Sequence, residues 1–288
     1  MRVASKTTYD LVKYTLANIS EGMYKANKTV ASGKSILDLS DDPVGLPQAL
    51  NIKSNLSNID QLGRNITLGK SWLNASESAL SHVQELISDA KALSVQMASS
   101  NTGSAERISN AGTVQNMLEE IIGLANTQVS GRYIFSGSKT DETPFSQGGT
   151  YTGDNSAFSI RIGKGETLDV GHDGDVVFGG VYTAFTEFKT ALEANDADGV
   201  RAVMDDLDSH FDRILNTISD VGARITRMEI RENIFQDLKI TSTDRLSKIE
   251  DADIAEAVID LAQKELAYKA ALSSSAKVME LSLVDYLS

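Results

Sequence analysis

The sequence predicts a mainly α protein, a long coiled-coil-like helical bundle made from both chain ends, with a small β-rich domain inserted in the middle. Three observations predict this fold. The chain of 288 residues holds only 3 prolines, so most of it is free to form long helices. Apolar residues recur at heptad spacing near both ends. Between the helical halves lies a stretch rich in Gly, Thr and Ser, in which apolar and polar residues alternate.

The first helix is expected over residues 5–31. Its apolar residues follow one another at alternating steps of four and three, which is the spacing of a coiled-coil interface. We call this row the N-terminal seam and expect it to be an assembly surface; it consists of Val12, Leu16, Ile19, Met23, Ala26 and Val30. The pair Ser32-Gly33 follows it and is typical of a helix C-terminus.

The segment SDDPVGLPQAL, which begins at Ser40, raises the question whether its two carboxylates form a chemical site or a joint. Adjacent side chains diverge in most backbones, so a shared proton or cation is not expected. An Asp before Pro is typical of a helix start, with the carboxylate as N-cap and Pro at the first helical position. Pro47 implies either a distorted first turn or a regular helix that begins close to it. We interpret the segment as an inter-domain joint formed by Asp41, Asp42, Pro43, Gly45 and Pro47.

A second helix is expected over about 48–100, where isoleucine and leucine recur every seven residues from Ile52 to Ile87. A third, about 104–129, is expected to close at Ser130-Gly131. Short strands are then predicted where Phe158, Ile160 and Ile162 alternate with polar residues, and again around Leu168 and Val170.

Helical periodicity returns at about 181–194 and 198–245, and a last helix is expected over 251–286. The apolar row of this last helix is the predicted C-terminal seam, which Glu265 and Ser275 interrupt; it consists of Ile254, Val258, Leu261, Tyr268, Leu272, Met279 and Leu283. Both ends carry apolar stripes of similar length, so we expect them to lie side by side. The predicted domains are a terminal coiled coil (1–42 and 248–288), a helical rod (43–130 and 198–247) and a β-rich outer domain with a helical return segment (131–197).

Composition excludes several classes of function. The net charge of −13 argues against nucleic-acid binding and against docking on anionic lipid. The chain has no cysteine, which excludes disulfides, thiolate metal sites and a Cys nucleophile. No run of 18 apolar residues exists, so no membrane insertion is expected, and the start lacks the apolar core of a signal peptide.

The motifs that mimic chemical sites have simpler interpretations. SGKS at Ser32 has Lys28 where a phosphate-binding loop needs its first glycine, and it follows a helix, so it is interpreted as a helix end. NDADG at Asn195 lacks the first ligand and the final glutamate of a calcium loop and is interpreted as a turn. The 3 histidines have no partner at metal-ligand spacing. We therefore expect no catalytic residue, cofactor or metal, and no enzymatic activity.

The run VASGKSILDLSDDPVGLPQALNIKSNL resembles the N-terminal signature of the bacterial flagellin superfamily. The C-terminal run from IEDADIAEAV to LSLVDYLS resembles the matching C-terminal signature, and both lie at the right distances from the chain ends. The start MRVASKTTYD, the segment NTQVSGRYIFSGSKTDETPF and the Asp-Tyr-Leu ending are similar to the hook-associated, junction-forming branch of that superfamily rather than to filament flagellin.

This resemblance implies a structural axial protein of the bacterial flagellum, extracellular, in a ring of identical subunits between hook and filament. Its implied partners are other copies of itself, the first hook-associated protein, flagellin, and an export chaperone that holds the C-terminal segment. It also implies type III export without a cleaved signal peptide.

One chain cannot cover both seams, so we expect the ends to be disordered in the free monomer and to fold as the ring assembles. Two alternatives stay open. One is a short filament flagellin, and the other is a cell-surface or phage-tail binding module with the β insertion as receptor binder.

Overall fold

The computed structural model describes residues 2–287, without the side chains of residues 2–5, 8 and 278–287. Its long helices are α1 (Arg2–Ser32), α2 (Gly45–Met97), α3 (Ser104–Ala125), α4 (Gly180–Glu193), α5 (Ala197–Glu250) and α6 (Ile254–Leu287). They form two compact units, one of residues 1–57 and 238–288, the other of residues 58–237. The fold is therefore mainly helical, as predicted, with its strands in the middle of the chain.

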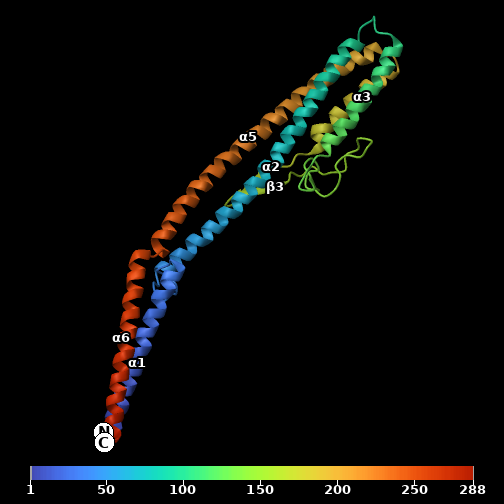
Figure 1. The fold of residues 1–288 in the computed structure, drawn as a ribbon. Helices are drawn as coiled ribbons and strands as arrows, with labels where there is room; N and C mark the ends of the chain where they lie inside the picture. The colour runs from blue at the N-terminus through green and yellow to red at the C-terminus, as the bar shows by residue number, and fades with distance from the viewer. Residues whose placement is uncertain (1, 288) are drawn as a thin grey trace. The chain divides into compact units, whose positions relative to one another are not determined.

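In the first unit, which we call the terminal unit, α1 packs along α6. The two chain ends lie side by side although they are the most distant parts of the sequence (Figure 1). Each helix has a row of apolar side chains whose exposure to water is unfavourable, and pairing of the helices covers part of both rows. The expectation that the two ends pair is confirmed.

The second unit has a continuous apolar core. The heptad row of α2 faces it, because Ile66, Leu73, Leu80 and Ile87 are completely buried. α5 covers this row with Leu207, Ile214, Val221 and Met228, and α3 packs against α4. The seven-residue spacing seen in the sequence is therefore a core stripe here.

The β region holds two small hairpins. β3 (Ser159–Gly163) pairs antiparallel with β4 (Glu166–Asp169), and the buried Ile160, Ile162 and Leu168 agree with the predicted alternation. β1 (Gln128–Val129) pairs with β2 (Arg132–Tyr133). The turn between β1 and β2 is Ser130-Gly131, both at positive φ, as hairpin turns of this length require. The prediction that this pair closes a third helix is wrong, since α3 ends at Ala125.

The β3–β4 hairpin is fastened to α5 by one carboxylate. Glu166 accepts a 2.7 Å hydrogen bond from Arg227 and a second from Arg231. These bonds hold the pKa of Glu166 below its usual value. None of the described helices is long and apolar enough to span a membrane.

Candidate assembly surface and joint

The start of α2 is built by Asp42. Its carboxylate accepts hydrogen bonds from the amides of Val44 (2.9 Å) and Gly45 (2.8 Å), and its carbonyl accepts the amide of Leu46 (3.1 Å). This is the hydrogen-bonding geometry of a helix N-cap. Pro43 lies in the turn between this cap and Gly45, the first residue of α2. The regular helix begins at Gly45, two residues before Pro47, which agrees with the second alternative left open by the sequence, a helix that begins close to that proline.

Asp41 has a different task, although it is the neighbour of Asp42. Its carboxylate accepts the amides of Asp38 (2.9 Å) and Leu37 (3.2 Å), which tightens the turn before the cap. These backbone hydrogen bonds hold the pKa of Asp41 below its ordinary value. The two carboxylates therefore serve separate backbone turns.

Gly45 allows the turn to close on itself. A Cβ atom there would lie 2.8 Å from Cδ1 of Ile36 and would overlap the carboxylate of Asp42. Gly45, Ile36 and Ala49 are all buried at this point of the terminal unit.

Helical structure is interrupted twice at the same level of the terminal unit, once between α1 and α2 and once between α5 and α6. Gly33, with φ of 71°, ends α1 in the left-handed conformation that favours glycine. Two backbone hydrogen bonds connect the segment after α1 with the segment after α5. They run from the amide of Ser35 to the carbonyl of Glu250 (2.7 Å) and from the amide of Ala252 to the carbonyl of Gly33 (2.9 Å). Asp253 caps α6 through the amides of Ala255 and Glu256.

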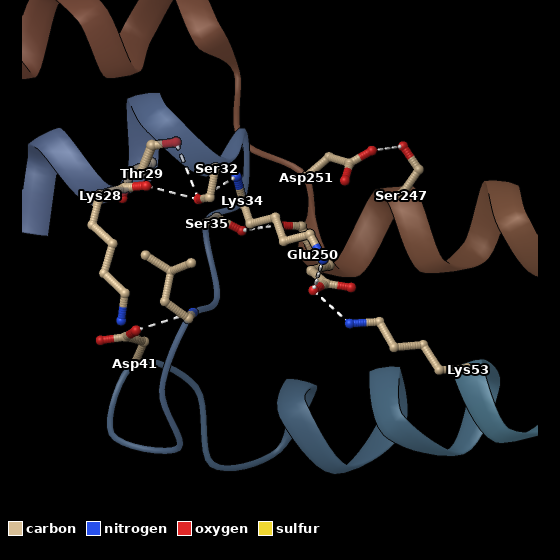
Figure 2. Close-up of polar contacts among 11 residues, drawn as sticks. Lys28, Thr29, Ser32, Lys34, Ser35, Asp41, Lys53, Ser247, Glu250 and Asp251 are labelled. Atoms are coloured by element: carbon tan, nitrogen blue, oxygen red, sulfur yellow. Dashed lines mark hydrogen bonds and ion pairs between the residues drawn. The ribbon is translucent and has the colours of Figure 1, made fainter.

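Glu250 links three segments through its side chain, as Figure 2 shows. Its Oε1 lies 2.7 Å from the Nζ atoms of both Lys34 and Lys53, while the residue itself is only 4% exposed. Burial opposes ionisation of this carboxyl, but the two lysine hydrogen bonds outweigh it and leave the pKa of Glu250 below its usual value. We call the contacts of residues 33–35 with residues 250–252, together with Lys53, the clamp.

The N-terminal seam lies on the face of α1 that packs against α6. Ala26 is buried, and the other five predicted members are half-buried. In contrast, Tyr9, Leu11, Tyr14 and Tyr24 on the remaining faces are more than half exposed.

The C-terminal seam is divided between faces. Leu261 and Tyr268 are half-buried, whereas Ile254, Val258 and Leu272 are 49%, 48% and 45% exposed. The side chains of Met279 and Leu283 lie outside the described ones. A row at steps of four and three is covered to a similar degree as Leu261; it consists of Ala257, Leu261, Lys264, Tyr268, Ala271 and Ser275.

The clamp was not visible to sequence reasoning. Lys34, Lys53 and Glu250 carry no shared motif, since Glu250 and Lys53 are 197 positions apart. The one available signal was the capping pattern of SGKS and DADIA, which marks both chain breaks but not their contact. In the described part of the chain no cluster of three His, Asp or Glu side chains could hold a metal ion.

Comparison with known proteins agrees with this architecture. The family described as the bacterial flagellin N-terminal helical region matches residues 5–140. The flagellar hook-associated protein 3 of Escherichia coli (strain K12) is 23% identical, and the alignment covers 98% of each chain.

Two solved structures have the same fold. FlgL of Bacillus cereus superposes with a TM-score of 0.62 at 23% identity, covering 68% of this chain and 99% of that one. The flagellar junction protein FlgL of Legionella pneumophila gives 0.58 at 16% identity, covering 70% and 100%. The fold and these matches together identify the chain as a structural, non-enzymatic protein of the flagellar hook–filament junction, similar over its full length to flagellar hook-associated protein 3 and over residues 5–140 to the flagellin N-terminal region.

Proposed function

We propose that identical copies of this chain form a ring that adapts the first hook-associated protein, on the hook side, to the first layer of flagellin. In this proposal residues 1–42 and 248–288 form the inner tube, residues 43–130 and 198–247 the rod shell, and residues 131–197 the outer surface. The chain acts by shape and contact rather than by chemistry.

The observation that carries the proposal is the incomplete cover of α6. Beyond the face that packs on α1, the part of this helix with described side chains, up to Lys277, exposes five large apolar ones, Ile254, Val258, Ile259, Leu266 and Leu272. A helix that is apolar on several faces is stable when several neighbours surround it. α1 supplies one neighbour, so the others are proposed to be helices of adjacent subunits.

The contacts between copies are proposed to be head-to-tail. A two-fold contact closes after two copies, whereas a head-to-tail contact continues around a ring. The exposed stripe of Ile254, Val258 and Leu272 and the stripe of Ile259 and Leu266 lie on different sides of α6, which gives each copy two distinct surfaces.

Membership of the flagellar junction implies flagellar partners; the specific ones are part of the proposal. We propose that the chain leaves the cell unfolded by the type III route and is held beforehand by a chaperone on its C-terminal segment. Pull-down of the full chain from cytoplasm, compared with a variant that carries Leu266→Asp, tests the chaperone contact.

The decisive experiment is electron microscopy of cells that lack the chain. We expect hooks without filaments, and flagellin in the medium. Normal filaments on these cells would overturn the proposal.

A short filament flagellin is the second candidate, because the matching family is described by the flagellin N-terminal region. Concentrated purified protein separates the two candidates. A junction protein stops at short rings, whereas a flagellin grows into long filaments. The third alternative, a surface or phage-tail binding module, predicts receptor or glycan binding by the full chain that is lost when the exposed face of the β region is altered.

A further inference from the structure

The buried residues of the terminal unit are concentrated around the clamp and the start of α2. Among its described side chains, those buried are Ala26, Ile36, Gly45, Ala49 and Glu250. Between Lys6 and Lys25 on α1, and from Ile254 to Lys277 on α6, every described side chain is half-buried or exposed. Burial of apolar surface is the main source of folding free energy, so we expect the region around the clamp and the start of α2 to be the most stably folded part of this unit.

We propose that the contacts of the clamp form already in the isolated molecule and fix the register of α1 against α6. The rest of the α1–α6 pair is then stabilised by contacts with neighbouring subunits. The proposal concerns folding of the single chain, and it rests on the proposed function only for the role of the neighbours.

The α1–α6 interface needs the clamp because its own side chains specify the register of the two helices weakly. Four of the six residues in the covered row of α6 are small or polar, namely Ala257, Lys264, Ala271 and Ser275. Small side chains pack similarly after a slip by one heptad, so they do not exclude shifted pairings.

The clamp excludes these slips. The amides of Ser35 and Ala252 reach their acceptors in only one alignment of the segment after α1 with the segment after α5. In that alignment Lys34 lies opposite Asp251 in an antiparallel bridge. A shift of either helix would leave both amides and the carboxylate of Glu250 without these partners. Of these groups Glu250 is buried, and a buried carboxylate without partners is costly, so the aligned register is favoured.

Glu250 makes closure cooperative. The segment between α1 and α2 contributes Lys34, α2 contributes Lys53, and α5 contributes the carboxylate between them (Figure 2). Asp251, which follows α5, accepts a hydrogen bond from Ser247 of that helix and faces away from this pair of lysines. Closing the backbone bridge therefore also satisfies a buried charge, and neither event is favourable without the other.

Amide hydrogen exchange of the full chain, measured in dilute monomeric solution, tests the proposal. We expect the amides of Ser35 and Ala252 to be protected in the natural sequence, and more strongly than that of Leu16. Glu250→Gln should lower protection at Ser35 and Ala252 by about tenfold or more, because a charge-assisted bond is lost. Glu265→Gln, at an exposed glutamate of α6, is the matched control and should change neither.

A disulfide provides the second arm, since the natural chain has no cysteine to interfere. Lys34 and Asp251 form the non-hydrogen-bonded type of antiparallel pair, in which the Cα atoms are about 4.5 Å apart. That separation suits a disulfide. Oxidised Lys34→Cys/Asp251→Cys should form readily in the monomer and should restore protection of the Ser35 and Ala252 amides in the Glu250→Gln background.

Unprotected clamp amides in the natural monomer, or equal exchange in the Glu250→Gln and Glu265→Gln variants, would overturn the proposal. The fluorescence of Trp72, the single tryptophan, reports whether the second unit remains folded in each variant. These outcomes are independent of the junction role. Filaments on cells that lack the chain would remove that role and leave the clamp intact, while failure of the exchange test would do the reverse.

Discussion

Glu250, the last residue of α5, accepts a 2.7 Å hydrogen bond from Lys53 of α2, although 197 positions separate the two residues in the sequence. The same carboxylate oxygen contacts Lys34 in the segment between α1 and α2. One buried carboxylate therefore connects the N-terminal and C-terminal parts of the chain, at the level where α1 is followed by α2 and α5 by α6.

Leu272→Asp should block assembly without affecting the monomer. Leu272 is 45% exposed on α6, so the substitution should change the free energy of unfolding by no more than about 0.5 kcal/mol. If neighbouring subunits cover this side chain, a carboxylate there should abolish ring formation, which sedimentation and electron microscopy would detect. Ser274→Asp, on another exposed face, is the control and should assemble.

Leu16→Asp should also prevent assembly, but through the α1–α6 interface, where Leu16 is half-buried. Trp72 fluorescence should show that the second unit keeps its stability. Loss of that stability would mean that the N-terminal seam belongs to the core of the monomer and not to an assembly surface.

Removing the cap of α2 should loosen the joint by a defined amount. Asp42→Ala loses two amide hydrogen bonds and should destabilise the helix start by about 1 kcal/mol, while Asp42→Asn keeps an acceptor and should cost less. Exchange of the Val44 and Gly45 amides measures the difference. Equal exchange in both variants would show that the carboxylate does not act as a cap.

Pro43→Ala/Pro47→Ala should change how firmly hook and filament attach, because these prolines restrict the backbone at the entry to α2. Swimming under viscous load is the readout. Unchanged motility of this double variant under load would argue against a mechanical role for the joint.

Arg107 should be a strong determinant of the second unit's stability. Arg107 is 6% exposed, and its guanidinium donates to the carbonyls of Met97 and Ser99 and to the side chain of Asn195. Arg107→Met leaves these acceptors without partners and should lower the free energy of unfolding by about 3 kcal/mol. Arg132→Met, at a half-exposed arginine, should cost less than about 0.5 kcal/mol in the same denaturant titration.

His172 should make the second unit sensitive to mild acid. Burial, with a contribution from Arg224 and against that of Asp220, lowers the pKa of His172 from 6.5 to about 4. The neutral imidazole is thus favoured in the folded state, so the full stability is present above pH 6.5 and is lost as the pH falls toward 4. The loss reaches about 3 kcal/mol.

His172→Leu should flatten this dependence between pH 6.5 and 4, measured by denaturant unfolding at each pH. His82→Leu, at an exposed histidine, is the control and should retain it. An unchanged profile in the His172 variant would assign the acid sensitivity to other groups, including His210, whose pKa burial also lowers.

The sequence by itself determined the helices, the inserted strands and the capping residues, because these depend on neighbours within a few positions. The seven-residue row from Ile66 to Ile87, the alternation around Ile160 and the cap at Asp42 are all local patterns. The same pattern failed at Ser130-Gly131, where two residues that suit a helix end form a hairpin turn instead.

Only the tertiary structure decided which face of α6 meets α1, and which charges meet at the joint. Ile254, Val258 and Leu272 follow the helical period as well as Leu261 does, but the covered row runs through Ala257, Lys264 and Ala271. Periodicity shows which faces of a helix are apolar. Which of these faces is packed depends on the size and direction of the side chains on the facing helix. Glu250, Lys34 and Lys53 approach one another only after both chain halves have folded, since an ion pair between distant positions leaves no trace in local spacing.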